Sequence, residues 1–180
     1  MKNTEYPRVS EVLAPYTDFS MVPEHVLTKK TEIGKAVHQT CAAICQGIWI
    51  PAIPLECQGY ITSFRKWFDA YVEEVIFVEK ELNDPVYHFL GHLDFYGKLK
   101  RLGLALLDWK IPITLYKQWK VQLSAYKRLL DVIEKPVDVI ASLQLNPEGK
   151  IPKMTRYEET GAEDFNIFLG LLNGHNYFRG

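Results

Sequence analysis

Two carboxylates and a lysine stand out in this sequence because mostly apolar residues surround them. Asp108 and Lys110 end the apolar segment 104–111, and Asp94 ends an earlier segment of similar character. The period of two of a β-strand puts Asp108 and Lys110 on the same face. A hairpin turn centred near Arg101 would place Asp94 opposite Asp108, with their Cβ atoms roughly 4.5–5.5 Å apart.

This arrangement favours a site that binds a metal cation and a phosphate group. Two carboxylates that close repel each other in an apolar sheet, so either one holds a proton or a cation lies between them. Mg²⁺ takes carboxylate oxygens, a backbone carbonyl and waters at about 2.0–2.1 Å. A lysine beside such a metal can orient water and stabilise charge on a phosphate, which suits phosphodiester hydrolysis. The alternative is that Asp108 and Lys110 form a plain ion pair on one strand face.

A histidine earlier in the chain could add a nitrogen ligand. His38 lies beside the apolar stripe of a predicted helix, and Gly34, one turn before it on the same face, leaves space over which an imidazole could reach. A lone histidine in this position is more often structural. Glu79 and Glu81 are expected to be ordinary strand or surface acids. His88 and His92 share the nominal face of Asp94 and could extend a metal site, but a β-bulge or ordinary strand packing explains them as well, so they are left out of the predicted site.

The elements that must position these residues follow from periodicity and turn signals. Helices are predicted at about 10–13, 31–47 (with Thr31 as N-cap), 60–74, 114–130 and 162–172. Strands are predicted at about 75–81, 86–96, 104–111, 137–145 and 151–157. We therefore expect an α/β (α+β) fold in one domain, 1–180, with an N-terminal helical part, 1–74, and the sheet and active-site core at 75–180.

Charge is distributed unevenly along the chain. The net charge is −1, which argues weakly against nucleic acid, but segment 95–130 has eight basic residues and one acid, whereas segment 69–84 has six acids and one lysine. A polyanion would be attracted to one side of such a molecule. The phosphate-contact candidates on the helix 114–130 are Lys117, Lys120, Lys127 and Arg128. Their alternative role is to keep the helix surface hydrated.

Cysteine usage and hydropathy bear on metal-binding cysteines and on membrane segments. Cys41, Cys45 and Cys57 lack the second pair that a structural zinc site needs, so buried reduced thiols are expected. No apolar run reaches the roughly 20 residues of a membrane helix, and the N-terminus has no apolar signal core. We expect a cytoplasmic protein without a membrane partner.

Four motifs, taken in order, resemble the RecB-type branch of the PD-(D/E)XK nuclease superfamily. They are Gly34-x-x-x-His38, Gly91-x-x-Asp94, Asp108-x-Lys110 and Gln122-x-x-x-Tyr126. This branch includes the Cas4 proteins and small exonucleases of phages and prophages, and the chain is most similar to the single-domain phage members. The similarity covers about residues 7–126. Each motif is common by chance, but four in this order on the expected elements form a fairly specific signal.

The resemblance implies a restriction-endonuclease-like core, with a central mixed β-sheet flanked by helices. It also implies that Mg²⁺ or Mn²⁺ is bound by His38, Asp94, Asp108 and the backbone carbonyl of Trp109, and that Lys110 is the catalytic lysine. The catalytic set is thus Asp94, Asp108 and Lys110. No iron–sulfur cluster is expected, because the cluster cysteines of related branches are absent.

The remaining motif and two departures from the family pattern concern the surroundings of this site. Gln122 and Tyr126 would position substrate or neighbouring catalytic groups. Ala42 stands where many members have an acid, and Ile111 stands where threonine is usual. The first departure puts a second metal or a water contact in doubt, and the second puts the support around Lys110 in doubt.

The expected function is a metal-dependent DNA nuclease, an exonuclease rather than a sequence-specific endonuclease, in phage or bacterial DNA recombination, repair or replication. DNA is the expected partner, with a phage recombinase or single-strand-binding protein as a further one, and the oligomeric state is open. A phage-encoded protein would act in the host cytoplasm. Two alternatives stay open: a protein of the same fold that binds DNA or a recombination partner but has lost turnover, and a metal hydrolase of another phosphate ester.

Overall fold

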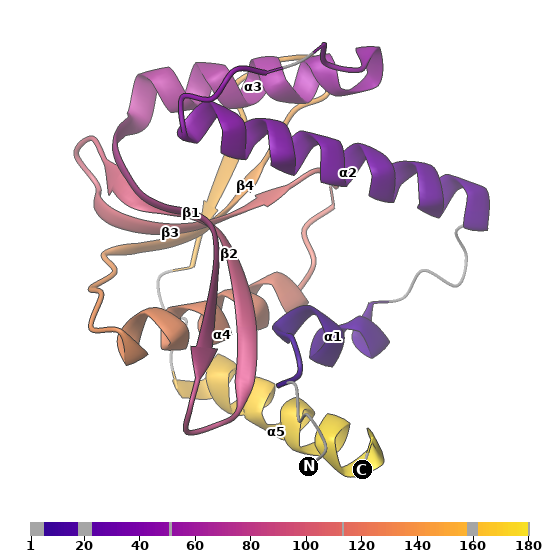
Figure 1. Ribbon diagram of the computed structural model, residues 1–180, viewed down its shortest axis with the longest axis vertical. Coiled ribbons are helices and arrows are strands. Elements are labelled where there is room, and N and C mark those ends of the chain that lie inside the picture. Colours follow the sequence, from indigo (N-terminus) through magenta and orange to yellow (C-terminus); the bar gives the residue numbers. More distant parts are fainter. Residues whose placement is uncertain (1–5, 18–22, 51, 113, 158–161, 180) are drawn as a thin grey trace.

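The computed structural model describes residues 6–17, 23–50, 52–112, 114–157 and 162–179 (Figure 1). The helices of these residues are α1 (Val9–Leu13), α2 (Glu24–Cys45), α3 (Leu55–Tyr71), α4 (Gln118–Val132) and α5 (Ala162–Arg179), and a short 3-10 helix spans Ala14–Tyr16. The strands are β1 (Val72–Asp84), β2 (Phe89–Leu99), β3 (Gly103–Lys110), β4 (Val139–Gln144) and β5 (Lys153–Arg156).

The strands form one mixed sheet in the order β1-β2-β3-β4-β5. The β1–β2, β2–β3 and β4–β5 pairs are antiparallel, whereas β3 and β4 are parallel. A parallel pair needs a crossover connection, and α4 provides it between β3 and β4. The predicted α+β class, with a central mixed sheet flanked by helices, is confirmed.

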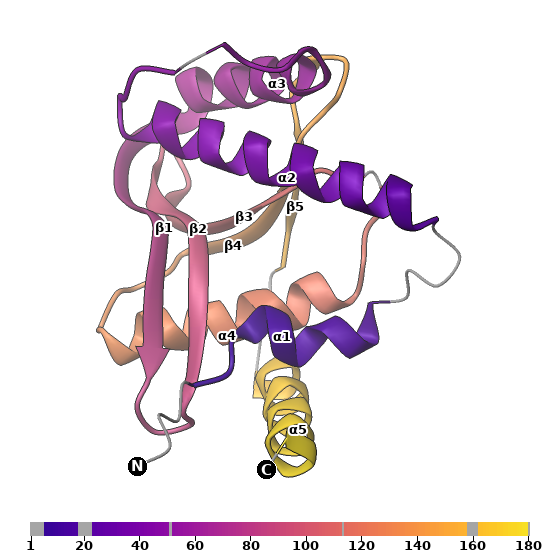
Figure 2. The same ribbon diagram turned by 45° about the vertical axis from the view of Figure 1, so that its right-hand side comes forward.

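Helices cover both faces of the sheet and separate two apolar cores. Figures 1 and 2 show α2 and α3 on one side and α1, α4 and α5 on the other. Leu106 belongs to the core under α4, whereas Leu107 and Trp109 belong to the core under α2 and α3. The period of two predicted for this strand is therefore confirmed, and both of its faces are buried where it carries apolar residues.

The two N-terminal helices begin earlier than predicted. Helix α2 starts at Glu24 after Pro23, so Thr31 is an interior residue whose hydroxyl donates to the Leu27 carbonyl at 2.9 Å. Proline is favoured at a helix start because it has no backbone N–H, and an N–H there would have no helical partner. Helix α3 likewise starts directly after Pro54 and not at residue 60. Both prolines start a helix, whereas we had assigned their surroundings to loops.

Gly59 belongs to the part of α3 that precedes the predicted start at residue 60. It lies inside the helix, where a Cβ atom would come within 1.6 Å of the Pro147 carbonyl oxygen. Glycine is therefore required for the loop after β4 to pack on this helix, although it normally weakens a helix interior. A packing requirement overrides the local preference at this position.

The remaining boundaries differ by smaller amounts. Helix α1 is capped at Arg8 and not at Ser10, because the Glu11 carboxylate accepts the Arg8 backbone N–H at 3.1 Å. Helix α4 begins at residue 118 and not 114, β1 extends over 72–84, and α5 continues to residue 179. Among the helices of the described segments, none is long and apolar enough to cross a membrane.

Candidate active site

The site lies where β2 and β3 separate. Their ladder runs from Leu99–Gly103, around a turn at Arg101, to Phe95–Leu107. Continuing this register by one residue puts Asp94 opposite Asp108, as predicted. Beyond this point β2 bends away from β3 (Figure 1). We call the place between Asp94, Asp108 and Lys110 the fork.

The Asp94 side chain hydrogen-bonds to β3 at the fork, where the backbone pairing of β2 with β3 has ended. Its Oδ2 atom accepts the backbone N–H of Trp109 at 2.7 Å, so this N–H is satisfied without a strand partner. Asp94 and Asp108 are both buried, at 7% and 2% exposure. The predicted pair of carboxylates inside an apolar sheet is therefore present.

A row of polar residues crosses the whole sheet at this level. Asp108 pairs with Ser142 on β4, and Ser142 pairs with Thr155 on β5. On the other side, Glu79 of β1 falls between the pairs Val78–Phe95 and Lys80–Leu93, which puts it opposite Asp94. The row is thus acidic on β1, β2 and β3 and carries hydroxyl groups on β4 and β5.

Helix α2 brings His38 to the acidic end of this row. Its Nδ1 atom lies 3.4 Å from Asp94 Oδ1 and 3.8 Å from Glu79 Oε1. Its ring meets the Trp109 ring edge-on, with 5.7 Å between the centroids. The space near Gly34 is occupied by Ile111 and not by the imidazole, because a Cβ on Gly34 would lie 3.7 Å from Ile111 Cδ1.

The other end of the fork is organised around Lys110. Its ammonium group forms an ion pair with Asp108 and donates to Gln122 Oε1 at 2.9 Å. The Gln122 amide in turn donates to the Tyr126 hydroxyl at 2.9 Å. The structure therefore places Gln122 and Tyr126 in one hydrogen-bonded chain that ends at Lys110.

Gly91 allows this chain to reach the sheet. A Cβ atom at this position would lie 2.3 Å from Leu129 Cδ1 and 3.0 Å from the Tyr126 ring. Any larger residue would push α4, and with it Gln122, away from Lys110. This contact gives the glycine of the Gly91-x-x-Asp94 motif a packing role.

The pKa values show how the charges at the fork are shared. Burial lowers the pKa of His38, but the carboxylates of Asp94, Glu79 and Asp108 outweigh it and raise the pKa to about 10. Burial would raise the pKa of Asp94, but His38, Lys110 and the Trp109 N–H hold it below its ordinary value. Asp94 and His38 therefore form a charged pair.

Asp108 behaves differently from Asp94. Burial raises its pKa, Lys110 opposes this shift, and the negative charge of Asp94 adds to it, which leaves the pKa at about 6. Burial and the charges of Asp108 and Asp94 also raise the pKa of Tyr126, so its phenol stays protonated. Both predicted remedies for the repulsion are therefore present. A protein cation lies beside each carboxylate, His38 beside Asp94 and Lys110 beside Asp108. Asp108 is the carboxylate that takes up a proton first as the pH falls.

The tightest group of possible metal ligands differs from the predicted one. One ligand atom each of His38, Glu79 and Asp94 lie within 4.8 Å of one another. Asp108 is outside this group and contacts Lys110. The Trp109 carbonyl remains a prediction as a metal ligand. Glu79 lies in strand β1, in agreement with the expectation of a strand or surface acid, but its Oε1 atom is buried beside His38.

The signal for Glu79 was present in the strand register. The turn at 85–88 between β1 and β2 brings β1 back along β2. Counting from that turn puts Glu79 opposite Asp94. The backbone of Glu79 has a φ of 47°, a left-handed conformation that the sequence does not reveal for a glutamate.

The basic residues of α4 are largely compensated by acids. Lys127 Nζ lies 2.6 Å from Asp131 Oδ1 one turn later, and Lys120 Nζ lies 2.9 Å from Asp164 Oδ2 of α5. The local excess of lysine and arginine in the sequence therefore does not produce an equal excess on the folded surface.

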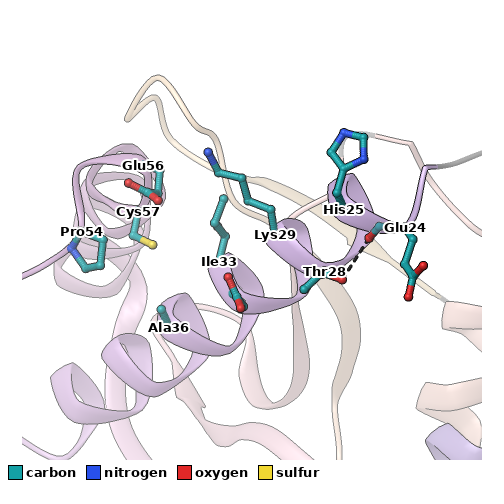
Figure 3. Close-up of a pocket in the computed structure, with 10 residues that line it drawn as sticks. Glu24, His25, Thr28, Lys29, Ile33, Ala36, Pro54, Glu56 and Cys57 are labelled. Carbon is teal, nitrogen blue, oxygen red and sulfur yellow. Dashed lines mark hydrogen bonds between the residues drawn. The ribbon is translucent and has the colours of Figure 1, made fainter.

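A cavity of about 830 Å³ lies elsewhere, between the first half of α2 and the start of α3 (Figure 3). Its lining includes His25, Lys29, Glu56 and Cys57, and it includes none of the motif residues of the fork. The candidate site is thus defined by converging side chains at the fork and not by this cavity.

Comparisons with known proteins add no relative. No protein-family model matches the chain, and no curated protein is similar enough to count as a match. The resemblance to nucleases therefore rests on the four motifs.

Proposed function

We propose that this protein is a metal-dependent deoxyribonuclease that hydrolyses phosphodiester bonds, and that it acts as an exonuclease. One observation carries the proposal: four motifs spread over residues 34–126 meet at one fork. His38 from α2 contacts Asp94 from β2. Lys110 from β3 contacts both Asp108 and Gln122 of α4.

The donor set at the fork suits Mg²⁺ or Mn²⁺. An imidazole nitrogen and carboxylate oxygens converge from separate elements, and imidazole together with carboxylate suits Mn²⁺ in particular. His38 and Asp94 would hold the ion, with Asp108 and the Trp109 carbonyl as further ligands. A bound ion of this kind supplies an activated water and stabilises charge on a phosphate.

Lys110 is placed to act on the phosphate that enters the fork. Its side chain is 15% exposed, so it is mostly buried but still reaches solvent. Gln122, which Tyr126 holds, fixes its direction. A preorganised cation in a partly dehydrated site stabilises developing negative charge more strongly than a mobile one on the surface.

The substrate, the place of action and the partners that we propose are those of a nuclease. DNA is the substrate, and the place of action is the cytoplasm, that of the host if a phage encodes the protein. A recombinase or single-strand-binding protein would supply or receive the DNA strand that an exonuclease exposes.

The test is cleavage of end-labelled single- and double-stranded DNA in the presence of Mg²⁺ or Mn²⁺. We expect the wild type to release short products from linear DNA, to leave circular DNA intact, and to lose activity with a chelator. Asp108→Asn and Lys110→Met should each be slower by about 10²–10³-fold, the loss typical of one preorganised stabilising group. Lys150→Met, whose exposed lysine pairs with Glu148 between β4 and β5, is the matched control.

Two results would contradict the proposal. The first is no cleavage by the wild type with either metal ion. The second is equal cleavage by the wild type, Asp108→Asn and Lys110→Met, which would point to a contaminating nuclease.

A further inference from the structure

Glu79 and Asp94 present their carboxylates to His38 in the same way. Asp94 Oδ2 is held by the Trp109 N–H at 2.7 Å, while Oδ1 lies 3.4 Å from His38 Nδ1. Glu79 Oε2 is held by His92 Nε2 at 2.6 Å, while Oε1 lies 3.8 Å from the same His38 atom. In each carboxylate one oxygen is anchored by a protein donor and the other faces the imidazole.

The free oxygen of Glu79 is buried without a hydrogen bond. Within the part of the chain that the structure describes, Glu79 Oε1 has no hydrogen-bond partner, and 3.8 Å is too long for a hydrogen bond to His38. A buried acceptor without a hydrogen bond is unfavourable, and more so when the group is charged. A cation shared with His38 and Asp94 would remove this cost.

The backbone supports the same reading. Glu79 has a φ of 47° within an antiparallel ladder whose neighbouring pairs are intact. For a residue other than glycine this conformation is unfavourable, because Cβ comes too close to the following carbonyl oxygen. Within β1 it occurs at Glu79, whose carboxylate meets His38, so the left-handed backbone serves to aim that side chain.

We propose that Glu79 is an additional protein ligand of the metal held by His38 and Asp94, and that His92 positions its carboxylate. This inference rests on the metal-dependent function proposed above. It adds a ligand from β1 to those from α2 and β2. His92 corresponds to the hydrogen-bonded partners that commonly orient carboxylate ligands, and their loss lowers metal affinity by about 10–100-fold.

Metal binding itself provides the test. Mn²⁺ is titrated into the purified full chain by calorimetry, and the free Mn²⁺ is counted in parallel by its electron paramagnetic resonance signal. Relative to the wild type, Glu79→Gln should raise the Kd by at least about tenfold, in the range expected for a disturbed metal site. Glu81→Gln is the matched control, because Glu81 lies on the same strand but pairs with Arg8 on the surface.

His92 variants test the positioning role without disturbing the fold. The His92 side chain is 43% exposed, so its replacement leaves the cores intact. His92→Ala should weaken Mn²⁺ binding, and His92→Gln, which keeps an N–H donor, should restore it in part. A merely structural histidine would show the same Mn²⁺ affinity in both variants. Circular dichroism melting verifies that each variant is folded.

The outcomes separate this inference from the nuclease proposal. A wild type that does not bind Mn²⁺, or a folded Glu79→Gln variant with wild-type affinity, overturns the assignment of Glu79. If Mn²⁺ binds and depends on Glu79 but no DNA is cleaved, the nuclease proposal fails and the ligand assignment stands. If DNA is cleaved and Glu79→Gln binds Mn²⁺ normally, the reverse holds.

Discussion

Charged residues gather in two regions of this protein, the fork and helix α4. Like charges lie close together at the fork, whereas on α4 basic residues are paired with acids. At the fork, neighbouring strands place Glu79, Asp94 and Asp108 side by side, so like charges are concentrated. On α4, each of Lys120, Lys127 and Arg128 contacts an aspartate. The strand register creates an electrostatic conflict in one region, and tertiary packing removes one in the other.

The difference shows why a local excess of charge is a poor guide to a binding surface. The aspartates that compensate α4 come from β1, from α5 and from α4 itself, so two of the three are distant in sequence. The acids at the fork gather because hairpins bring adjacent strands together. Acids concentrated in a buried place, more than basic composition, mark the candidate site.

The largest loss of stability is expected in the compensated region. Asp84 is fully buried; its Oδ2 accepts from Arg128 Nε at 2.7 Å, and its Oδ1 accepts the backbone N–H groups of Val86 and Tyr87 at 2.7 and 2.9 Å. Asp84→Ala leaves these donors unpaired and should lower the free energy of unfolding by about 3 kcal/mol. Urea denaturation measures the change, and a loss below about 0.5 kcal/mol would contradict the role assigned to this pair.

The same residue makes stability depend on acid. The two N–H groups and Arg128 outweigh burial and hold the pKa of Asp84 below its ordinary value. Its contribution is therefore present above the pKa of the unfolded chain, about 3.9, and is lost as pH falls through the lower folded value. Asp84→Ala should show a flatter decline of stability below about pH 4 than the wild type.

Metal binding at the fork should release a proton, which would further distinguish the fork from helix α4. With a pKa of about 10, His38 is protonated at pH 7, and it must lose this proton to bind a metal ion. The Mn²⁺ affinity should therefore rise by about tenfold per pH unit between pH 7 and pH 9, with release of about one proton. Calorimetry in buffers of different ionisation enthalpy measures the release. An affinity that does not change with pH would contradict the charged His38–Asp94 pair.

The smallest effect is expected on the exposed side of α4. Lys127 and Asp131 form an ion pair one helical turn apart and are 35% and 40% exposed. Such pairs contribute about 0.3–0.5 kcal/mol and are screened by salt. Lys127→Met should change the free energy of unfolding by no more than this amount, with a smaller change in 1 M salt. A larger change would mean that α4 depends on its surface charges and not on its apolar face.

Much of the fold and part of the candidate site could be read from the sequence. The alternation along 104–111 predicted which residues of β3 face each core, and the turn at Arg101 predicted that Asp94 opposes Asp108. These features follow from local periodicity, which packing did not override. The starts of α2 and α3 could not be read in the same way, because Pro23, Pro54 and Gly59 are typical of loops until their partners are known.

The sequence by itself determined the strand periods, the hairpin register and the order of the four motifs. Only the tertiary structure decided that Glu79 lies beside His38, that Gln122 and Tyr126 hold Lys110, and which acids compensate α4. The physical reason is that a period of two or 3.6 residues is a property of a short segment. Contacts between a helix and a strand depend on how the whole chain closes around its two cores.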